Sequence, residues 1–345
     1  MSIYIIVFII LVIFCCFENN KKLFYMAIFA LFIIAALRGE DVDRDYKTYL
    51  SIYDYLVNGY QYTIEPTFIL LCLVSKSLIN SPFLIFPVYA ALGLYFKSKF
   101  IKEYSPYLFL SLVVYYSNFF FIHELTQIRI GVASAIGFYS IKYLIRDNKK
   151  TFVLMVLFSC LFHFSMVVFL VALFFDKNKI DIRFVISIFF MLFLSYILIG
   201  LKLSPLDILQ YVPISVIHEK LVMYKYQTQH GMIEPVNVFS VMQFLRIGIV
   251  AFVFFHARKF SNNSAMVLLT KIYSLSPICL VLLSSLPAFA IRLSELFAVA
   301  DIVLLPIIVT YCTQKKIAKV VVIALSATAL FINLYHNEIV NGYYI

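Results

Sequence analysis

Long runs of apolar residues constrain the fold of this chain more than any other feature of its sequence. Many are long enough to cross a hydrocarbon core of about 30 Å as a helix that rises about 1.5 Å per residue. Inside such a core a segment must satisfy its own backbone N–H and C=O groups, which favours helices. The clearest runs are residues 3–17, 82–98, 106–122, 125–141, 184–201, 237–255, 272–291, 293–312 and 317–334.

The amino-acid composition argues against a sizeable soluble domain. Hydrophobic residues make up 63% of the 345 residues and charged residues only 13%, so almost nothing remains for a soluble domain. The sequence therefore predicts an all-α polytopic integral membrane protein with about 10 full transmembrane helices. We expect residues 1–345 to form a single transmembrane domain.

The positions of the basic residues set the expected orientation. The formal net charge is +10, but the lysines and arginines are spread over short connectors and do not form the basic patch of a nucleic-acid-binding protein. Connectors rich in Lys and Arg face the cytoplasm, and both termini then lie on the outer face. The basic connectors are 18–22, 97–105, 142–150, 176–183, 256–263 and 313–319.

Two apolar segments do not fit this alternation as simple crossings. Residues 63–79 are expected to be re-entrant or interfacial on the outer side. Residues 151–175 join two basic connectors, so they either enter and return as a hairpin with His163 at the bend or form one tilted span. In both arrangements His163 lies at membrane depth and needs a polar partner.

Two connectors on the outer side are long enough to cap a site. Loop 38–62 contains apolar residues at helical spacing over 46–58, which predicts an amphipathic helix on the outer interface. Loop 202–236 contains the sequence SPLD at 204–207, a typical helix start. We expect these two loops to cover the functional site.

Arginines at membrane depth are expected to have a polar partner or a function, because inserting an arginine at the centre of a bilayer costs about 2.5–3.5 kcal/mol on insertion scales. Arg38, Arg129 and Arg292 all lie near the outer ends of their segments, so they are predicted to converge on one anionic ligand. The alternatives are ordinary pairing: Arg292 with Glu295, and Arg129 with Glu124. The same alternative applies to Arg246, for which Glu295 and Asp301 are the candidate partners.

The first outer loop also contains carboxylates at alternate positions, Asp41, Asp43 and Asp45. Such a pattern is able to hold a hard cation, but no glycine turn or distal glutamate completes a calcium loop. Salt bridges to Arg38 and Arg44 are therefore the favoured interpretation, and we expect a reaction that needs no metal or other cofactor.

Five motifs occur along the chain in a fixed order: LRGEDVDRDYKTY (37–49), EPTF (65–68), TQIRIGVASAI (126–136), LFHFS (161–165) and IRLSELF (291–297). This ordered set resembles the EpsG family of bacterial polysaccharide polymerases, which is related in function to the Wzy O-antigen polymerases. The resemblance covers most of the chain, from about residue 25 to residue 310.

The resemblance implies a reaction and a set of site residues. An acceptor hydroxyl attacks the anomeric carbon of a sugar carried on undecaprenyl diphosphate, and the diphosphate departs at the outer face of the bacterial inner membrane. His163 is the first candidate for the general base, followed by Glu65 and Asp45, while Arg129 and Arg292 clamp the diphosphate. The residues expected to bind substrate are Arg38, Arg44, Tyr46, Tyr49, Gln127 and Glu295.

The implied partners are the undecaprenyl-diphosphate-linked oligosaccharide, membrane lipid and a protein that regulates chain length. Two other classes of function use similar residues. A flippase for lipid-linked sugars also needs intramembrane arginines, and a membrane O-acyltransferase also needs a buried histidine. The sequence leaves these alternatives open, because neither residue type is specific to one reaction.

Overall fold

The computed structural model describes residues 2–18, 20–201 and 235–342, together with the single residues 203, 222 and 226. Over these residues the chain is helical, and the isolated bridge between Asp43 and Val340 is the only β-type pairing. The predicted all-α class is confirmed. The helix start predicted at 204–207 lies outside the described residues, as does most of the predicted cap 202–236.

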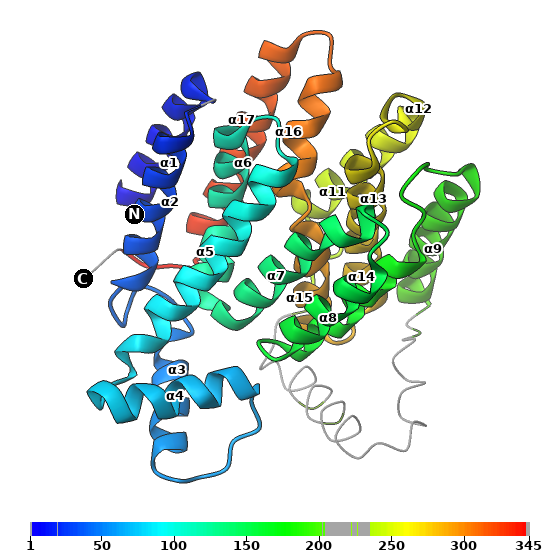
Figure 1. Ribbon diagram of the computed structural model, residues 1–345. Helices are drawn as coiled ribbons and strands as arrows, with labels where there is room; N and C mark the ends of the chain where they lie inside the picture. Colours follow the sequence, from blue (N-terminus) through cyan, green and yellow to red (C-terminus); the bar gives the residue numbers. More distant parts are fainter. Residues whose placement is uncertain are drawn as a thin grey trace. The chain divides into compact units, whose positions relative to one another are not determined.

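The helices form two compact units, Met1–Phe174 with Asp301–Ile345, and Phe175–Ala300. The prediction of one transmembrane domain over the whole chain stays a prediction. The helices of the first unit, shown in Figure 1, are α1 (Ser2–Phe14), η1 (Cys15–Phe17), α2 (Lys21–Ala36), α3 (Tyr46–Val57), α4 (Pro66–Ile79), η2 (Pro82–Leu84), α5 (Ile85–Tyr104), α6 (Leu108–Tyr115), the π-helical η3 (Tyr116–Thr126), α7 (Ile128–Ile145), α8 (Lys149–Cys160), the 3₁₀-helical η4 (Phe164–Phe174), α16 (Asp301–Tyr311), α17 (Lys315–Phe331) and the π-helical η6 (Ile332–His336).

Among the described residues, six helices are long and apolar enough to cross a membrane. A seventh results if the consecutive helices α15 (Pro287–Ala298) and α16 count as one span. Apolar helices such as Ser2–Phe17 and Val241–Phe255 are shorter, so the expected number of about ten crossings stays a prediction. The six helices are Pro82–Tyr104, Leu108–Thr126, Ile128–Ile145, Ile182–Gly200, Ser264–Leu282 and Lys315–His336.

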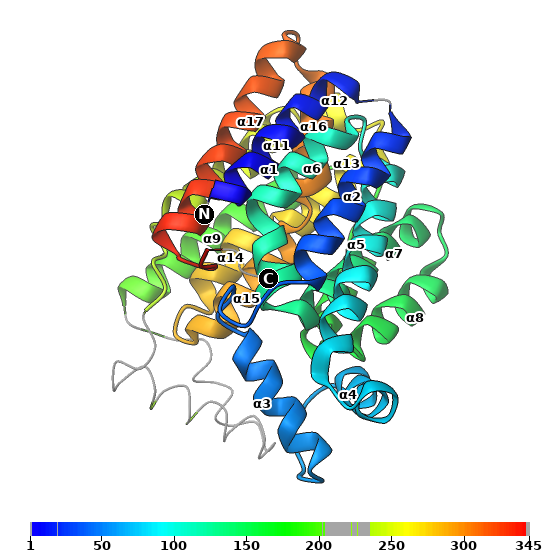
Figure 2. The ribbon, with the colours of Figure 1, turned by 90° about the vertical axis from the view of Figure 1, so that its left-hand side faces the viewer.

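The continuous helix formed by α6 and η3 is the centre of the first unit. It is apolar on every side and almost wholly buried, as expected for a helix surrounded by other helices. Helices α1, α5, α7, α16 and α17 pack around it. The turns α1–α2 and α16–α17 lie at one end of this unit and α3 and α4 at the other (Figure 1, Figure 2), which agrees with the predicted separation of 18–22 and 313–319 from 38–62.

Residues 151–175 form a hairpin and not a single span. Helix α8 and η4 pack against each other and against α7, and the rings of Phe152 and Phe169 are 6.2 Å apart although 17 positions separate them. Gly137 of α7 permits the close approach, because a Cβ atom there would lie 2.2 Å from the Met166 Cε. Gly137 therefore serves helix packing at this position.

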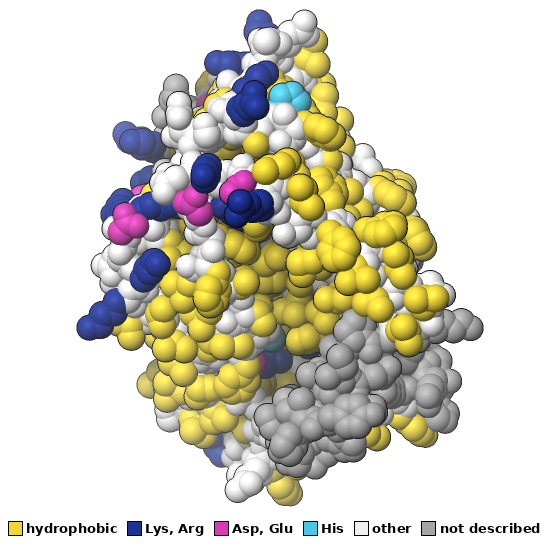
Figure 3. All heavy atoms as spheres, turned by 90° about the vertical axis from the view of Figure 1, so that its right-hand side faces the viewer, with side chains coloured by type: hydrophobic (Ala, Val, Ile, Leu, Met, Phe, Trp, Pro, Cys, Tyr) yellow, Lys and Arg dark blue, Asp and Glu magenta, His cyan; other side chains and the backbone are white. Residues whose placement is uncertain are grey.

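The second unit contains α9 (Ile182–Gly200), α11 (Val241–Phe255), α12 (Ala257–Phe260), α13 (Ser264–Tyr273), α14 (Leu275–Leu282) and α15. Helix α14 is its centre and contacts α9, α11, α13 and α15. Helix α9 exposes large apolar side chains, among them Ile186, Phe190 and Phe193, and hydrophobic side chains cover much of the face in Figure 3. Such a surface is suited to contact with lipid.

Candidate functional site

An ion pair between Arg129 and Glu65 is the centre of the candidate site. Glu65 directly precedes Pro66, the first residue of α4, and its backbone is extended, as is usual before proline. Its buried carboxylate accepts a hydrogen bond from the Arg129 Nη1 at the start of α7. The Arg129 side chain remains 24% exposed while that of Glu65 is 5% exposed, so the guanidinium is the member of the pair that a ligand is able to reach.

Tyr49 of α3 contacts the same guanidinium from another direction. The phenol and the guanidinium interact electrostatically. The Arg129 Cζ lies 6.0 Å from the ring centroids of both Tyr49 and Phe68, within the range of cation–π attraction. Burial raises the pKa of Tyr49 to about 12. The phenol is therefore neutral at physiological pH and can donate a hydrogen bond.

His163 lies at the break between α8 and η4, and contacts with α4 bring it to the ion pair. Thr67 donates from its Oγ1 to the Leu161 carbonyl at 2.7 Å, which fixes the bend. The His163 Nε2 is then 4.0 Å from the Glu65 Oε1. The Nδ1 is 2.7 Å from the Ser165 Oγ and 3.3 Å from the Ser165 backbone N–H. A neutral ring with its proton on Nε2, on the side of Glu65, satisfies both contacts.

Two buried polar atoms at the site have no hydrogen-bond partner among the described residues. They are the Arg129 Nε and the Gln127 Oε1. Gln127 ends η3 immediately before α7. Because buried polar groups are normally bonded, the unmet Nε donor of the partly exposed Arg129 guanidinium indicates a place for a polar ligand. The structure thus brings together Tyr49, Glu65, Arg129 and His163 from the predicted set, and Gln127 lies two residues before Arg129 in the chain.

Arg38 holds the first outer loop in place. Its Nε donates to the Asp43 Oδ2 at 2.7 Å, its Nη1 to the Ala35 carbonyl at 2.6 Å and its Nη2 to the Leu125 carbonyl at 2.7 Å. The predicted salt bridge to the loop carboxylates is confirmed for this arginine. Burial raises the pKa of Asp43, and the Arg38 charge opposes that rise.

The remaining predicted loop residues also contact protein groups. Arg44 donates to the backbone carbonyls of Asn337 and Glu338 and does not pair with a loop carboxylate, contrary to expectation. The Tyr46 ring stacks on Phe86 with centroids 4.2 Å apart. Asp45 occupies the N-cap position of α3. The substrate-binding or catalytic roles of Arg38, Arg44, Asp45 and Tyr46 stay predictions.

A second buried ion pair was not anticipated from the sequence. Lys97 lies within α5 and donates to the Glu124 carboxylate and, at 3.2 Å, to the Gly131 carbonyl. The Tyr115 hydroxyl donates to the same carboxylate at 2.8 Å. The alternative pairing of Arg129 with Glu124 is therefore wrong, and so is the placement of Lys97 in a solvated connector. Two opposite charges within apolar segments were the available signal.

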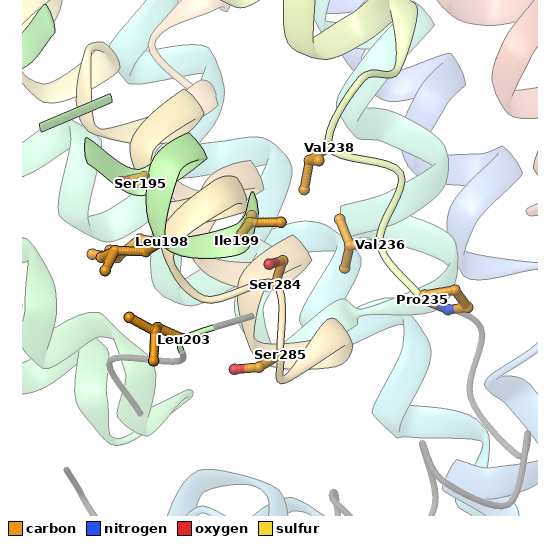
Figure 4. A pocket seen from close by; sticks show the side chains of 10 residues that line it. Ser195, Leu198, Ile199, Leu203, Pro235, Val236, Val238, Ser284 and Ser285 are labelled. Atoms are coloured by element: carbon orange, nitrogen blue, oxygen red, sulfur yellow. The ribbon is translucent and has the colours of Figure 1, made fainter. Parts of the chain in front are cut away.

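Arg292 and Glu295 belong to the second unit, on α15. Arg292 is exposed, and the Glu295 carboxylate interacts electrostatically with both Arg246 and Arg292. The predicted convergence of Arg292 with Arg129 stays a prediction. A hollow of about 300 Å³ in the same unit is lined mainly by apolar side chains of α9 and segment 235–238 (Figure 4), and none of its described lining residues was predicted as a site residue.

No three His, Cys, Asp or Glu side chains within the described ranges are grouped to hold a metal ion. This includes the three aspartates of loop 38–62, where Asp43 pairs with Arg38 and the exposed Asp41 pairs with Lys47. The expectation of a reaction without metal is not tested by this arrangement and stays a prediction.

Fold and site together define a multi-span helical membrane protein with a charged cluster, Tyr49, Glu65, Arg129 and His163, at the end of one helical unit that contains α3 and α4. Residues 21–344 match the model of the EpsG family, and the chain belongs to that family. It is 26% identical over 326 residues, 86% of this chain and 85% of the relative, to the amylovoran biosynthesis protein AmsC of Erwinia amylovora. No solved structure matches the chain.

Proposed function

We propose that the protein polymerises lipid-linked oligosaccharide repeat units of an O-antigen or exopolysaccharide. Membership of the EpsG family and similarity to an amylovoran biosynthesis protein support a role in polysaccharide synthesis. The observation that carries the proposed chemistry is the Arg129–Glu65 pair, a reachable guanidinium and a buried carboxylate in direct contact. Such a pair is able to stabilise an anionic leaving group and to take a proton.

The reaction is a glycosyl transfer from undecaprenyl diphosphate. The oxygen of an acceptor hydroxyl forms a bond to the anomeric carbon of the donor sugar. The bond from that carbon to the diphosphate oxygen breaks, and its electron pair leaves with the undecaprenyl diphosphate. The hydroxyl proton passes to a base in the protein. The arginine acts where negative charge develops, which is the largest contribution in reactions of this type.

Proton transfer and charge stabilisation are coupled through the ion pair. In the resting site the Glu65 carboxylate neutralises Arg129. When Glu65 accepts the hydroxyl proton it loses its charge, and the full positive charge of the guanidinium becomes available to the departing diphosphate. The unbonded Arg129 Nε supplies a further donor. One proton transfer thus activates the acceptor hydroxyl and strengthens the stabilisation of the departing diphosphate.

The contacts of His163 favour Glu65 as the proton acceptor. The imidazole Nδ1 contacts the Oγ and the backbone N–H of Ser165, and the Nε2 lies 4.0 Å from the Glu65 Oε1, so a ring protonated at Nε2 directs that proton toward Glu65. His163 then acts as a positioning residue for the Glu65 carboxylate. We propose this role in place of the general-base role that the sequence suggested for His163. General-base catalysis typically contributes about 10²–10⁴-fold to rate, so Glu65 and His163 are separable by the size of their effects.

The proposal places the reaction at the outer face of the bacterial inner membrane, with both termini periplasmic. The cluster lies beside α3 and α4, at the end of the first unit opposite the basic turns α1–α2 and α16–α17 (Figure 2), and basic connectors face the cytoplasm. A chain-length regulator is a proposed protein partner. Preorganised arginines supply the electrostatic stabilisation, so we propose that no metal takes part.

Deletion of the gene separates this function from its alternatives. Loss of a polymerase leaves single repeat units on the lipid carrier at the outer face, and restoring the wild-type gene returns long chains. Loss of a flippase leaves repeat units on the cytoplasmic side, and loss of an O-acyltransferase leaves chains of normal length without acyl groups. Either of the last two phenotypes would contradict the proposed function.

A further inference from the structure

The second unit contains another buried arginine, Arg246 of α11, which the reaction above does not use. Its side chain lies among helices α14 and α15, where Nη1 donates to the Ser294 Oγ at 2.7 Å. Ser294 is itself 3.1 Å from the Ser276 Oγ. Arg246 is only 7% exposed, yet its Nε has no hydrogen-bond partner among the described residues. A buried guanidinium therefore retains an unused donor.

Two acceptors next to this arginine are also unused. Gln243 precedes Arg246 by three positions on α11, so both side chains lie on one face of the helix. Its Nε2 donates to the Pro277 carbonyl at 2.9 Å, but its fully buried Oε1 has no partner in the described structure, and neither does the Glu295 Oε2. Three unmet polar atoms in one neighbourhood indicate a missing polar ligand.

The same set of side chains forms the site of the first unit. There the arginine is Arg129, with an unbonded Nε, the carboxylate is Glu65, and the amide is Gln127, with an unbonded Oε1. In the second unit Arg246, Glu295 and Gln243 have the corresponding roles. Both units thus contain an arginine with an unbonded Nε and a glutamine with an unbonded Oε1, although Arg129 bonds directly to Glu65 while Arg246 bonds to Ser294.

We propose that Arg246 and Ser294 form a second anion site, which binds the diphosphate of a second lipid-linked sugar, and that the Gln243 Oε1 accepts a hydroxyl of that sugar. The inference rests on the proposed function, because polymerisation joins two substrates that each carry a diphosphate. In this site the guanidinium N–H groups of Arg246 donate to phosphate oxygens, as guanidinium groups commonly do. Arg292 adds a positive charge, so the three charged groups Arg246, Arg292 and Glu295 sum to a net positive charge that favours an anion.

Glu295 is the group that opposes an anion, and it limits where the phosphates sit. Its free Oε2 is an acceptor and repels phosphate oxygens, but it suits a sugar hydroxyl. The proposed site therefore takes the diphosphate at Arg246 and a hydroxyl of the attached sugar at Glu295. A purely structural role is the competing account, in which Arg246 only joins α11 to α15 through Ser294.

Binding stoichiometry of sugar-free polyprenyl diphosphate tests the inference without requiring catalysis. The full chain is purified in detergent, and bound lipid is counted by native mass spectrometry and titration calorimetry. We expect two molecules per wild-type chain, one for Arg246→Met, one for Arg129→Met and none for the double variant. Arg258→Met, which removes an exposed arginine of α12, is the matched control and should still bind two.

Thermal unfolding of each purified variant identifies any that fail to fold, and Arg246→Lys is the second variant for that case. A lysine retains the charge without the bidentate fork, so this variant should bind two molecules, one of them about tenfold more weakly. Two molecules bound by Arg246→Met at wild-type affinity, or one bound by the wild type, would overturn the second site. Two diphosphates bound without any polymerisation would instead contradict the proposed function.

Discussion

The buried pair Lys97–Glu124 makes a quantitative prediction about stability. Both side chains are 1% exposed, so water does not screen either charge. Lys97→Met leaves the Glu124 carboxylate buried with only the Tyr115 hydroxyl as a described side-chain donor. Removing one partner of a buried pair typically costs about 3–5 kcal/mol because an uncompensated charge remains. We expect this range for Lys97→Met and also for Glu124→Met.

The double variant Lys97→Met/Glu124→Met should be much more stable than either single variant. Replacing a buried ion pair by apolar side chains of similar volume is often neutral. Loss of the Lys97 bond to the Gly131 carbonyl adds about 1 kcal/mol. Methionine is the appropriate replacement for Glu124, because its flexible chain can adapt to Gly93, where a Cβ would lie 2.4 Å from the present Glu124 Oε2.

Unfolding in mixed micelles of mild detergent and SDS measures all four free energies. The coupling energy of the double-mutant cycle is predicted to approach the sum of the two single-variant costs, because the double variant itself loses only about 1 kcal/mol. The exposed pair Lys47–Asp41, with side chains 68% and 71% exposed, is the control and should show no measurable coupling. Additive effects at Lys97 and Glu124, or single variants that cost less than about 1 kcal/mol, would refute the reasoning.

Three further predictions concern the site and its packing. Glu65→Gln should lower kcat by about 10²–10⁴-fold, and His163→Gln by less, in single-turnover assays with synthetic lipid-linked repeats; equal losses would contradict the assignment of the base. Gly137→Leu should cost about 1–3 kcal/mol by SDS titration because it overpacks Met166, whereas Gly137→Ala should cost less because that methionine can shift. Between pH 10 and pH 12 the unfolded state loses the Tyr49 proton first, so wild type should lose roughly 2–3 kcal/mol of stability relative to Tyr49→Phe, and parallel pH profiles would contradict this.

Local sequence patterns were sufficient for the helical class and for individual elements. The helix predicted over 46–58 is observed as Tyr46–Val57, because apolar spacing along one face depends only on neighbouring residues. The charges of the two connectors that flank residues 151–175 predicted either a hairpin or one tilted span, and the contacts of α8 with η4 show the hairpin. The number of membrane crossings is harder to predict from the sequence, because several apolar helices are near the minimum length for a span.

Pairing of charges could not be predicted as well, because it depends on how helices neighbour one another. Glu124 was the alternative partner considered for Arg129, five positions away, but it pairs with Lys97, which α5 brings across 27 positions. Arg129 pairs instead with Glu65, 64 positions earlier. The sequence marked Glu65, Arg129 and His163 individually, and only the docking of the hairpin bend on α4 through Thr67 brings them together.

Gln243 and Arg246 illustrate a different limit. Arg246 was interpreted as a structural pairing residue, since carboxylates were available at Glu295 and Asp301. Its described hydrogen bond is to the neutral Ser294, and the unbonded atoms around it are visible only in three dimensions. A sequence marks which polar residues lie in apolar segments, but it does not count their hydrogen bonds.

Polymerisation by the purified protein tests the central claim most directly. The full chain is incubated with synthetic undecaprenyl-diphosphate repeat units in the presence of a chelator, and products are separated by length. Wild type and the Arg258→Met control are predicted to give a ladder of products. Arg129→Met, folded by its thermal unfolding profile, is predicted to lower the rate at least about 100-fold. An unchanged ladder from Arg129→Met would contradict the account.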